Sequence, residues 1–314
     1  MTTMTRPPAH AGLMTEVAPG VAFSPARRRT LVAFAAIYLI WGSTYLAIRY
    51  GVETIPPFLL TGARCLVAGG LMYGWARYRG AASPGLRAWI AALGVGVLLF
   101  VVGQGLVGWA ETRVSSGPAA LIVATVPLWM VLLAWWRRVA AAPSTRIWLG
   151  LAAGLVGVAL LVRPGADASV DPAGALALLI AALSWACGSQ WARSSALPAS
   201  RLQSAGMQLV AAGVVLGALS LALGEPAGFA VAGVSAASLS ALVYLIAFGS
   251  VVGFSAYLWL LDHHPPAKVG SHAYVNPLVA VLLGALAGDV VLTVWVVLAA
   301  VAVIAAVMLT TIDA

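Results

Sequence analysis

Long apolar runs, separated by short polar segments, dominate the chain. A helix of roughly 20 mainly apolar residues is long enough to cross a lipid bilayer, so the pattern predicts an all-α integral membrane protein with ten transmembrane helices. Residues 1–30 are polar, contain proline and show no periodicity, and we expect a disordered tail there. The predicted spans are residues 31–50, 57–76, 88–109, 117–136, 147–162, 173–192, 203–223, 239–260, 267–287 and 291–311.

Related residues recur at fixed offsets in the two halves of the chain. Trp185 follows Trp41 by 144 positions, and Pro277 follows Pro127 by 150 positions. We interpret the halves as two copies of a five-helix unit. Because five is an odd number, the second copy enters the membrane from the opposite side, and such inverted repeats are typical of secondary transporters. The predicted repeats are residues 31–165 and 172–314.

Basic residues are unevenly distributed over the predicted loops. If the chain begins in the cytoplasm, thirteen Arg and Lys residues fall in inner segments, and the outer ones are Arg49, Arg113 and Arg163. Lys and Arg are enriched on the cytoplasmic side of membrane proteins. We therefore predict that both termini are cytoplasmic.

The composition agrees with this class of protein. The chain is 62% hydrophobic and 8% charged, with a mean hydropathy of +1.00, which excludes a soluble globular domain. Its net charge of +8 comes from residues at the edges of apolar runs, so we predict the lipid bilayer and no nucleic acid as a partner. No metal or cofactor motif is present. Arg outnumbers Lys sixteen to one, which with the abundant Ala, Gly, Val and Leu indicates a GC-rich bacterial genome, so we predict a bacterial inner membrane as the location. We expect a monomer or weak homodimer.

Several short motifs occur in an order that resembles a known family. They are Trp41-Gly42-Ser43, the segment 57–64, the sequence ATVPL at 124–128, GLVGVALLVRPG at 154–165 and YVNPL at 274–278. This order resembles the EamA family of the drug/metabolite transporter superfamily, especially its amino-acid and metabolite exporter branch of YddG-type and YedA-type proteins. The resemblance implies a basket in which spans one to four and six to nine surround a central cavity, with spans five and ten peripheral.

Arg64 is the only Arg or Lys well inside a predicted span. Placing such a charge near the centre of a membrane helix costs about 2.5–3.5 kcal/mol on insertion scales, so a compensating partner is expected. One candidate is a substrate carboxylate, which suits the guanidinium group. The alternative is an internal partner, such as a helix-end carbonyl, Glu53 or Glu111.

Two helix faces carry tryptophan together with hydroxyl groups. Trp41, Thr44 and Tyr45 lie on one face of the first span, and Trp185 and Ser189 lie on one face of the sixth. Buried hydroxyl groups in a membrane need partners, so these faces are predicted to look toward protein or a cavity. Packing of helix against helix is the open alternative.

Further polar residues inside the spans complete the predicted substrate-binding set. Pro127 and Pro277 are predicted to kink their helices near the cavity, where they serve gating or plain packing. No acidic residue lies at the centre of a span, so a central carboxylate proton relay is not predicted. The additional binding candidates are Gln104, Gln208, Tyr244, Tyr257, His272, Tyr274 and Asn276.

The leading functional hypothesis is an inner-membrane carrier that exports small metabolites by alternating access. Aromatic faces without several buried cations favour amino acids with aromatic or apolar side chains over anionic solutes. A multidrug exporter of lipophilic cations is an alternative of the same class. A membrane enzyme acting on lipid-linked substrates is a different class, and no catalytic constellation for it is present. The sequence therefore predicts a transporter and no enzyme.

Overall fold

The computed structural model describes residues 25–138, 142–161, 170–264, 269 and 272–311. Within these ranges every regular element is a helix. The predicted tail up to residue 24, part of the linker between the predicted repeats and the last residues of the chain lie outside them. The first helix begins at Pro25. Residues 25–30, the last part of the predicted tail, are therefore helical.

The first half of the chain supplies helices at each of its five predicted spans. The third span is one long helix with a π-helical segment in its middle, and the fourth is interrupted after Val123. The elements are α1 (Pro25–Gly51), α2 (Pro57–Tyr78), α3 (Leu86–Gly96), η1 (Val97–Gln104), α4 (Gly105–Ala110), α5 (Ser116–Val123), α6 (Val126–Trp136) and α7 (Thr145–Leu161).

The second half repeats this order. Its third span is again a long helix with a π-helical segment, while Pro277 lies inside an uninterrupted helix. The elements are α8 (Pro172–Ser194), α9 (Arg201–Ala222), the 3-10 turns η2 (Glu225–Gly228) and η3 (Val231–Gly233), α10 (Ala236–Tyr244), η4 (Leu245–Val252), α11 (Gly253–His263), α13 (His272–Leu286) and α14 (Val294–Thr311).

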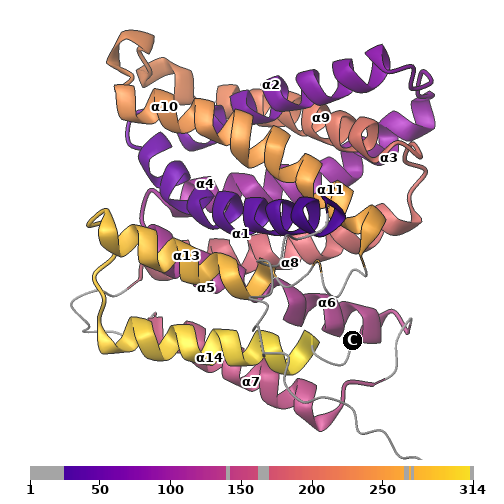
Figure 1. Cartoon of the computed structure of the whole chain (residues 1–314). Helices are drawn as coiled ribbons and strands as arrows, with labels where there is room; N and C mark the ends of the chain where they lie inside the picture. Colours follow the sequence, from indigo (N-terminus) through magenta and orange to yellow (C-terminus); the bar gives the residue numbers. More distant parts are fainter. Residues whose placement is uncertain (1–24, 139–141, 162–169, 265–268, 270–271, 312–314) are drawn as a thin grey trace, which may run out of the picture.

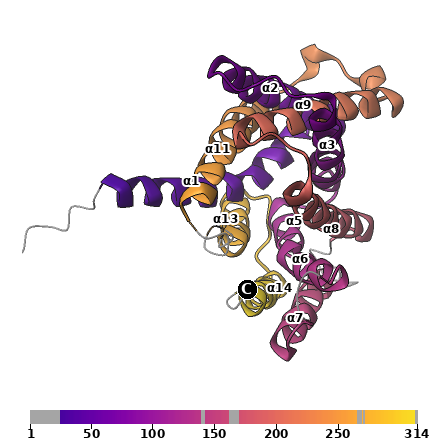
Figure 2. The same cartoon turned by 90° about the vertical axis from the view of Figure 1, so that its right-hand side faces the viewer.

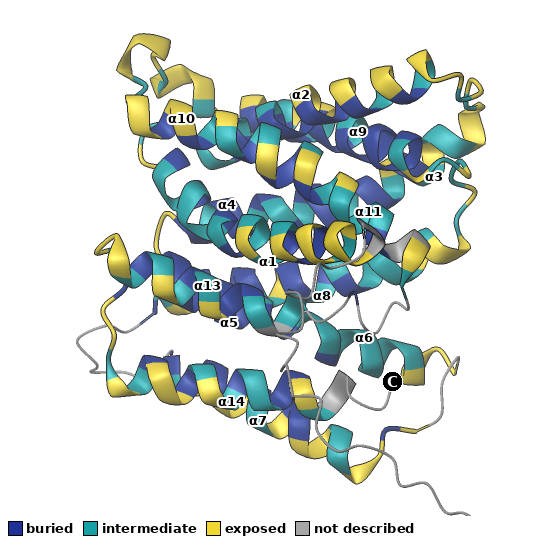
Figure 3. Ribbon diagram, in the orientation of Figure 1, coloured by how far each residue is buried: buried dark blue, intermediate teal, exposed yellow. Residues whose placement is uncertain are grey.

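Six described helices are long and apolar enough to cross a membrane. Their outward faces carry large apolar side chains, including Leu39, Leu176 and Val214, that are more than half exposed. Figure 3 shows exposed positions along the outer faces of the helices and buried positions between them. Apolar side chains exposed on this scale are suited to lipid rather than water.

The helices run side by side in stacked rows, with α2 and α9 at one edge of the molecule (Figure 1). These two helices approach so closely that side chains are excluded between them. A Cβ atom on Gly69 would lie 2.6 Å from the backbone nitrogen of Val210, and one on Gly206 would lie 2.5 Å from that of Tyr73. Small residues permit this kind of backbone contact between membrane helices.

At the opposite edge α7 packs against α14, and this pair borders α5, α6 and α13 (Figure 2). Between the two edges α1 packs against α13, α11 and α10, and α8 packs against η1, α4, α5 and α6. Each of α1 and α8 therefore lies mainly against helices from the other half of the chain. This arrangement brings the two tryptophan faces against the two π-helical segments.

Candidate functional site

Arg64 lies in the N-terminal half of α2, with 8% of its surface exposed. Its Nε donates a hydrogen bond to Ser250 Oγ at 2.8 Å, and one terminal nitrogen donates to Gln104 Oε1 at 3.4 Å. These partners lie in the two π-helical segments η4 and η1. Both are neutral, and neither is Glu53 or Glu111, the acids considered from the sequence. The guanidinium group is thus held in position without a countercharge from these partners.

Trp41 meets the same π-helical segment from α1. Its indole Nε1 donates to the carbonyl of Gly249 at 3.1 Å, next to Ser250 in the chain. A Cβ atom on Gly249 would lie 3.4 Å from a terminal nitrogen of Arg64. The π-helical segment η4 therefore brings Trp41 and Arg64 to one place. Such segments interrupt regular helices and are frequent at functional sites.

Aromatic rings surround Trp41 on its other sides. The Trp41 ring lies 5.1 Å from Tyr257 and 5.1 Å from His272, measured between centroids, and 5.5 Å from Phe254. His272 Nδ1 also contacts the carbonyl of Val269 at 3.0 Å. Three residues predicted to bind substrate, on α1, α11 and α13, are thus in direct ring contact.

Trp185 occupies the corresponding position on the other π-helical segment. A Cβ atom on Gly103 would lie 3.2 Å from its ring, just as one on Gly253 would lie 2.5 Å from Trp41. The Trp185 ring also packs edge-on against Phe100, with centroids 6.0 Å apart. The two tryptophans therefore have matching surroundings, built from opposite halves of the chain.

Phe100 and Phe254 connect the two tryptophans. Their ring centroids are 5.8 Å apart, and each contacts one of the tryptophans. We refer to Trp41, Phe254, Phe100 and Trp185 as the aromatic row. It lies where the two predicted faces come together.

The remaining predicted residues take different positions. Tyr244 shares a hydrogen bond of 2.6 Å with Ser43 beside Trp41, and Thr44 Oγ1 donates to the carbonyl of Trp41. The Asn276 amide, oriented so that its nitrogen faces acceptors, donates to the carbonyls of Tyr38 and His272. These three stabilise the helices that carry the aromatic site.

The other predicted binding residues make no contact with the Arg64 site in the described part of the chain. Gln208 donates to Ser204 within α9, and Tyr45 packs in an apolar cluster at the far end of α1. Ser189 is half-buried on α8, and Tyr274 belongs to α13 with its side chain outside the described part. Pro127 follows the interruption between α5 and α6.

A groove of about 800 Å³ lies beside the N-terminal part of α1. Its lining includes Arg28, Arg29, Val252 and Trp259. None of the predicted binding residues lines it, although it borders the outer side of η4. The groove and the aromatic site are therefore separate features.

Four residues of the site were not predicted from the sequence: Phe100, Phe254, Gly249 and Ser250. The last two look like ordinary small residues in the apolar run LIAFGSVVG. The available signal was the correspondence of Gly103 with Gly253, 150 positions apart, since each glycine marks the segment that contacts a tryptophan.

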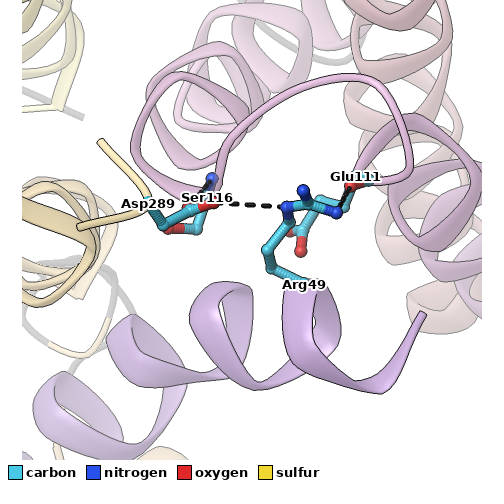
Figure 4. Close-up of polar contacts among 4 residues, drawn as sticks. All are labelled: Arg49, Glu111, Ser116 and Asp289. Atoms are coloured by element: carbon cyan, nitrogen blue, oxygen red, sulfur yellow. Dashed lines mark hydrogen bonds and ion pairs between the residues drawn. The ribbon is translucent and has the colours of Figure 1, made fainter. Parts of the chain in front are cut away.

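A second polar cluster lies where α1 and α4 end and α5 begins (Figure 4). Arg49 Nε lies 3.2 Å from Asp289 Oδ1, and another Arg49 nitrogen donates to the carbonyl of Glu111 at 3.3 Å. The other Asp289 oxygen accepts from the backbone nitrogen of Ser116 at 2.8 Å. We refer to Arg49, Glu111, Ser116 and Asp289 as the Arg49 cluster.

Comparisons with known proteins add the following findings. Residues 28–163 and 172–312 match the EamA-like transporter family. The chain is 41% identical over 254 residues to YedA of Escherichia coli (strain K12), described as an uncharacterized inner membrane transporter, with 80% of each chain covered. It is 27% identical over 257 residues to protein PagO of Salmonella typhimurium, covering 80% of this chain and 83% of PagO.

One solved protein crystal structure has the same fold. It superposes with a TM-score of 0.62 at 21% identity and covers 92% of this chain and 98% of the other. At this identity the likeness shows the fold alone.

Proposed function

Because the chain belongs to the EamA-like transporter family of the drug/metabolite transporter superfamily, as the sequence motifs predicted, we propose which solutes this membrane transporter carries and how. We propose that it exports small metabolites across the inner membrane, chiefly amino acids, including those with aromatic or apolar side chains. Transport proceeds by alternating access around the site formed by Arg64 and the aromatic row.

The architecture of the proposed transporter is two inverted five-helix repeats with ten membrane crossings and cytoplasmic termini. Described helices fall within all ten predicted spans, although most of residues 267–271, at the start of the ninth span, lie outside the described part; this supports the arrangement. The crossed contacts of Trp41 with η4 and Trp185 with η1 also support it, because each tryptophan packs on the other repeat. In inverted-repeat transporters the substrate site lies between the repeats near the middle of the membrane.

The observation that carries the proposal is the buried guanidinium group of Arg64 with two neutral partners. A buried cation in a low dielectric interacts strongly with an anion that reaches it. A substrate carboxylate supplies such an anion, and it pairs well with the planar guanidinium group. Arg64 would therefore bind the carboxylate while the aromatic row contacts an apolar side chain.

The aromatic row also supports one competing function. Rings of Trp, Tyr and Phe attract cations through their faces, so Trp41 with Tyr257 and Phe254 offers a surface for a lipophilic cation. The nearby positive charge of Arg64 opposes binding of a cation. For this reason we favour the zwitterion over the cation.

A matched pair of competitors tests the choice. The purified chain in liposomes takes up labelled L-phenylalanine, and excess unlabelled L-phenylalanine or phenethylamine, which lacks the carboxylate, is added. We expect the amino acid to compete and phenethylamine to have little effect, because only the former engages Arg64. Equal or stronger competition by phenethylamine would favour the lipophilic-cation exporter.

A double variant locates the site. We expect Trp41→Ala combined with Trp185→Ala to lower uptake about tenfold or more, since each aromatic pair contributes about 0.5–1.5 kcal/mol and two tryptophans are lost together. Trp136→Ala serves as the matched control, because Trp136 is 78% exposed at the end of α6. Unchanged uptake in the double variant of a folded protein would place the site elsewhere.

A further inference from the structure

Glu111 lies immediately after the last residue of α4, and none of its surface is exposed. Neither carboxyl oxygen has a hydrogen-bond partner in the described part of the chain, and neither does Ser116 Oγ. An ionised carboxylate buried without a partner is costly, so such a group keeps a proton instead. The geometry therefore describes a protonated Glu111.

The charges around Glu111 act in opposite directions. Burial raises the pKa of Glu111 well above its ordinary value, and the nearby Asp289 raises it further. The positive charge of Arg49 opposes both effects. The protonation state of the Glu111 carboxyl group therefore depends on where the Arg49 guanidinium group lies.

The other neighbouring elements contribute few ionisable groups. On α1, Tyr45 interacts electrostatically with Glu111 one turn before Arg49. The segment between α13 and α14 contributes Asp289, and α5 contributes the uncharged Ser116. The first residues of α8 follow Asp171, which accepts from Gly174. Arg113 is exposed and lies over the Trp109 ring.

We propose that Glu111 is a proton-binding site of this transporter and that, once ionised, it competes with Asp289 for Arg49. The proposal rests on the proposed transport function only for its coupling to substrate movement. Figure 4 shows Arg49 reaching from α1 between Asp289 and Glu111. Because Arg49 already donates to the Glu111 carbonyl, a small movement of the guanidinium group takes it from one carboxylate to the other.

The consequence of this exchange is mechanical. The bond from Arg49 to Asp289 joins α1 of the first half to the α13–α14 connection of the second, and Asp289 also binds the start of α5. When ionised Glu111 draws Arg49 away, the pair that joins the two halves at this end is lost. Proton binding thus favours the closed junction, and proton release favours its opening.

Among the described residues, the corresponding positions of the second half do not form a second site of this kind. Arg193 is the residue 144 positions after Arg49, but it is exposed, and Leu261 stands 150 positions after Glu111. The Arg49 side chain is 33% exposed against 11% for Asp289, so we expect water to reach the cluster along Arg49. In the proposed orientation this end faces outward, so protons enter from outside the cell.

Infrared spectroscopy of the full chain, in a detergent that contains no carbonyl groups, tests proton binding without any substrate. A protonated carboxyl group has a carbonyl stretch separate from the bands of carboxylates. We expect one such band at neutral pH in the wild type, its absence in Glu111→Gln, and its retention in Asp171→Asn, a control that keeps a good helix cap. Absence of the band in the wild type, or its retention in Glu111→Gln, would overturn the proposal.

Uptake of labelled L-phenylalanine with and without a pH gradient then tests coupling. We expect the gradient to change the uptake rate several-fold in the wild type and in Asp171→Asn, but not in Glu111→Gln. If no amino acid is taken up while the infrared band depends on Glu111, the proton site stands and the proposed substrate fails. If uptake occurs and the gradient has no effect on the wild type, coupling through Glu111 is refuted.

Discussion

Arg64 and Arg49 are built into the molecule in parallel ways but with different partners. Each arginine contacts one residue of its own half of the chain and one residue of the other half. Arg64 is buried and held by the neutral Ser250 and Gln104, whereas Arg49 is partly exposed and paired with the carboxylate of Asp289. Arg64, whose partners are neutral, is suited to binding an anionic ligand. Arg49, which is paired with a carboxylate, is suited to joining the two halves of the chain.

Removing the charge of Arg64 gives the largest effect. We expect Arg64→Met to lower kcat/KM for L-phenylalanine uptake about 10- to 100-fold, because hydrogen bonds to charged groups contribute about 1.5–3 kcal/mol. Methionine keeps a long flexible side chain in the same space. The initial uptake rate over a range of concentrations measures the change. We expect Arg49→Met to lower kcat/KM less than Arg64→Met does. An equal decrease in kcat/KM in both variants would mean that the two arginines do not differ in this way.

Giving Arg64 a countercharge also tests whether Arg64 binds the substrate carboxylate. Ser250 Oγ lies 2.8 Å from Arg64 Nε, so Ser250→Asp places a carboxylate against the guanidinium group. We expect this internal ion pair to compete with the substrate carboxylate and to raise KM about tenfold, a shift of about 1.4 kcal/mol. Ser250→Ala is the control, since it removes the hydroxyl group and adds no charge. A lower KM in Ser250→Asp would show that Arg64 does not bind substrate.

The pH dependence of stability distinguishes the Arg49 cluster. The pKa of Glu111 is raised in the folded protein, so its protonated form stabilises the fold. This contribution to the free energy of unfolding is fully present below the unfolded-state pKa, about 4.3 for Glu. It is lost as the pH rises from there through the folded-state pKa, with a slope of at most about 1.4 kcal/mol per pH unit. We expect the thermal midpoint in detergent, followed by tryptophan fluorescence, to fall with rising pH.

Glu111→Gln cannot ionise at this position, so its midpoint should depend less on pH than that of the wild type. Asp171→Asn should keep the wild-type dependence. An identical pH profile for the wild type and Glu111→Gln would mean that the Glu111 carboxyl is ionised in the folded protein.

The sequence predicted the helices well because their signal is local. Apolar runs of membrane length and the breaks between them are properties of neighbouring residues. In the described part of the chain, most of the helices begin and end close to the predicted limits. The first helix is longer than predicted because the arginines at 27–29 marked the edge of the apolar run and not the end of the helix. Helix formation does not require apolar residues, so hydropathy underestimates such extensions.

The site was predicted less completely because its contacts are long-range. Trp41 and Arg64 were found as unusual residues, but their meeting at Gly249 and Ser250 depends on packing of helices about 200 positions apart. Glu111 was considered only as a partner of Arg64. Its own burial depends on the approach of α1, α5 and Asp289, which no local pattern of residues reveals.

Substitutions of Asp289 are expected to have the smallest effect, and they separate the ion pair with Arg49 from the bond to the start of α5. Asp289→Asn removes the charge opposite Arg49 but retains an oxygen that accepts from the Ser116 backbone. Since Arg49 is partly exposed, we expect a loss of at most about 1 kcal/mol. Asp289→Ala also removes the bond at the start of α5, which adds about 1 kcal/mol. The same thermal measurement separates the two contributions, and if Asp289→Asn alone equals Asp289→Ala, the ion pair and not the helix cap holds this junction.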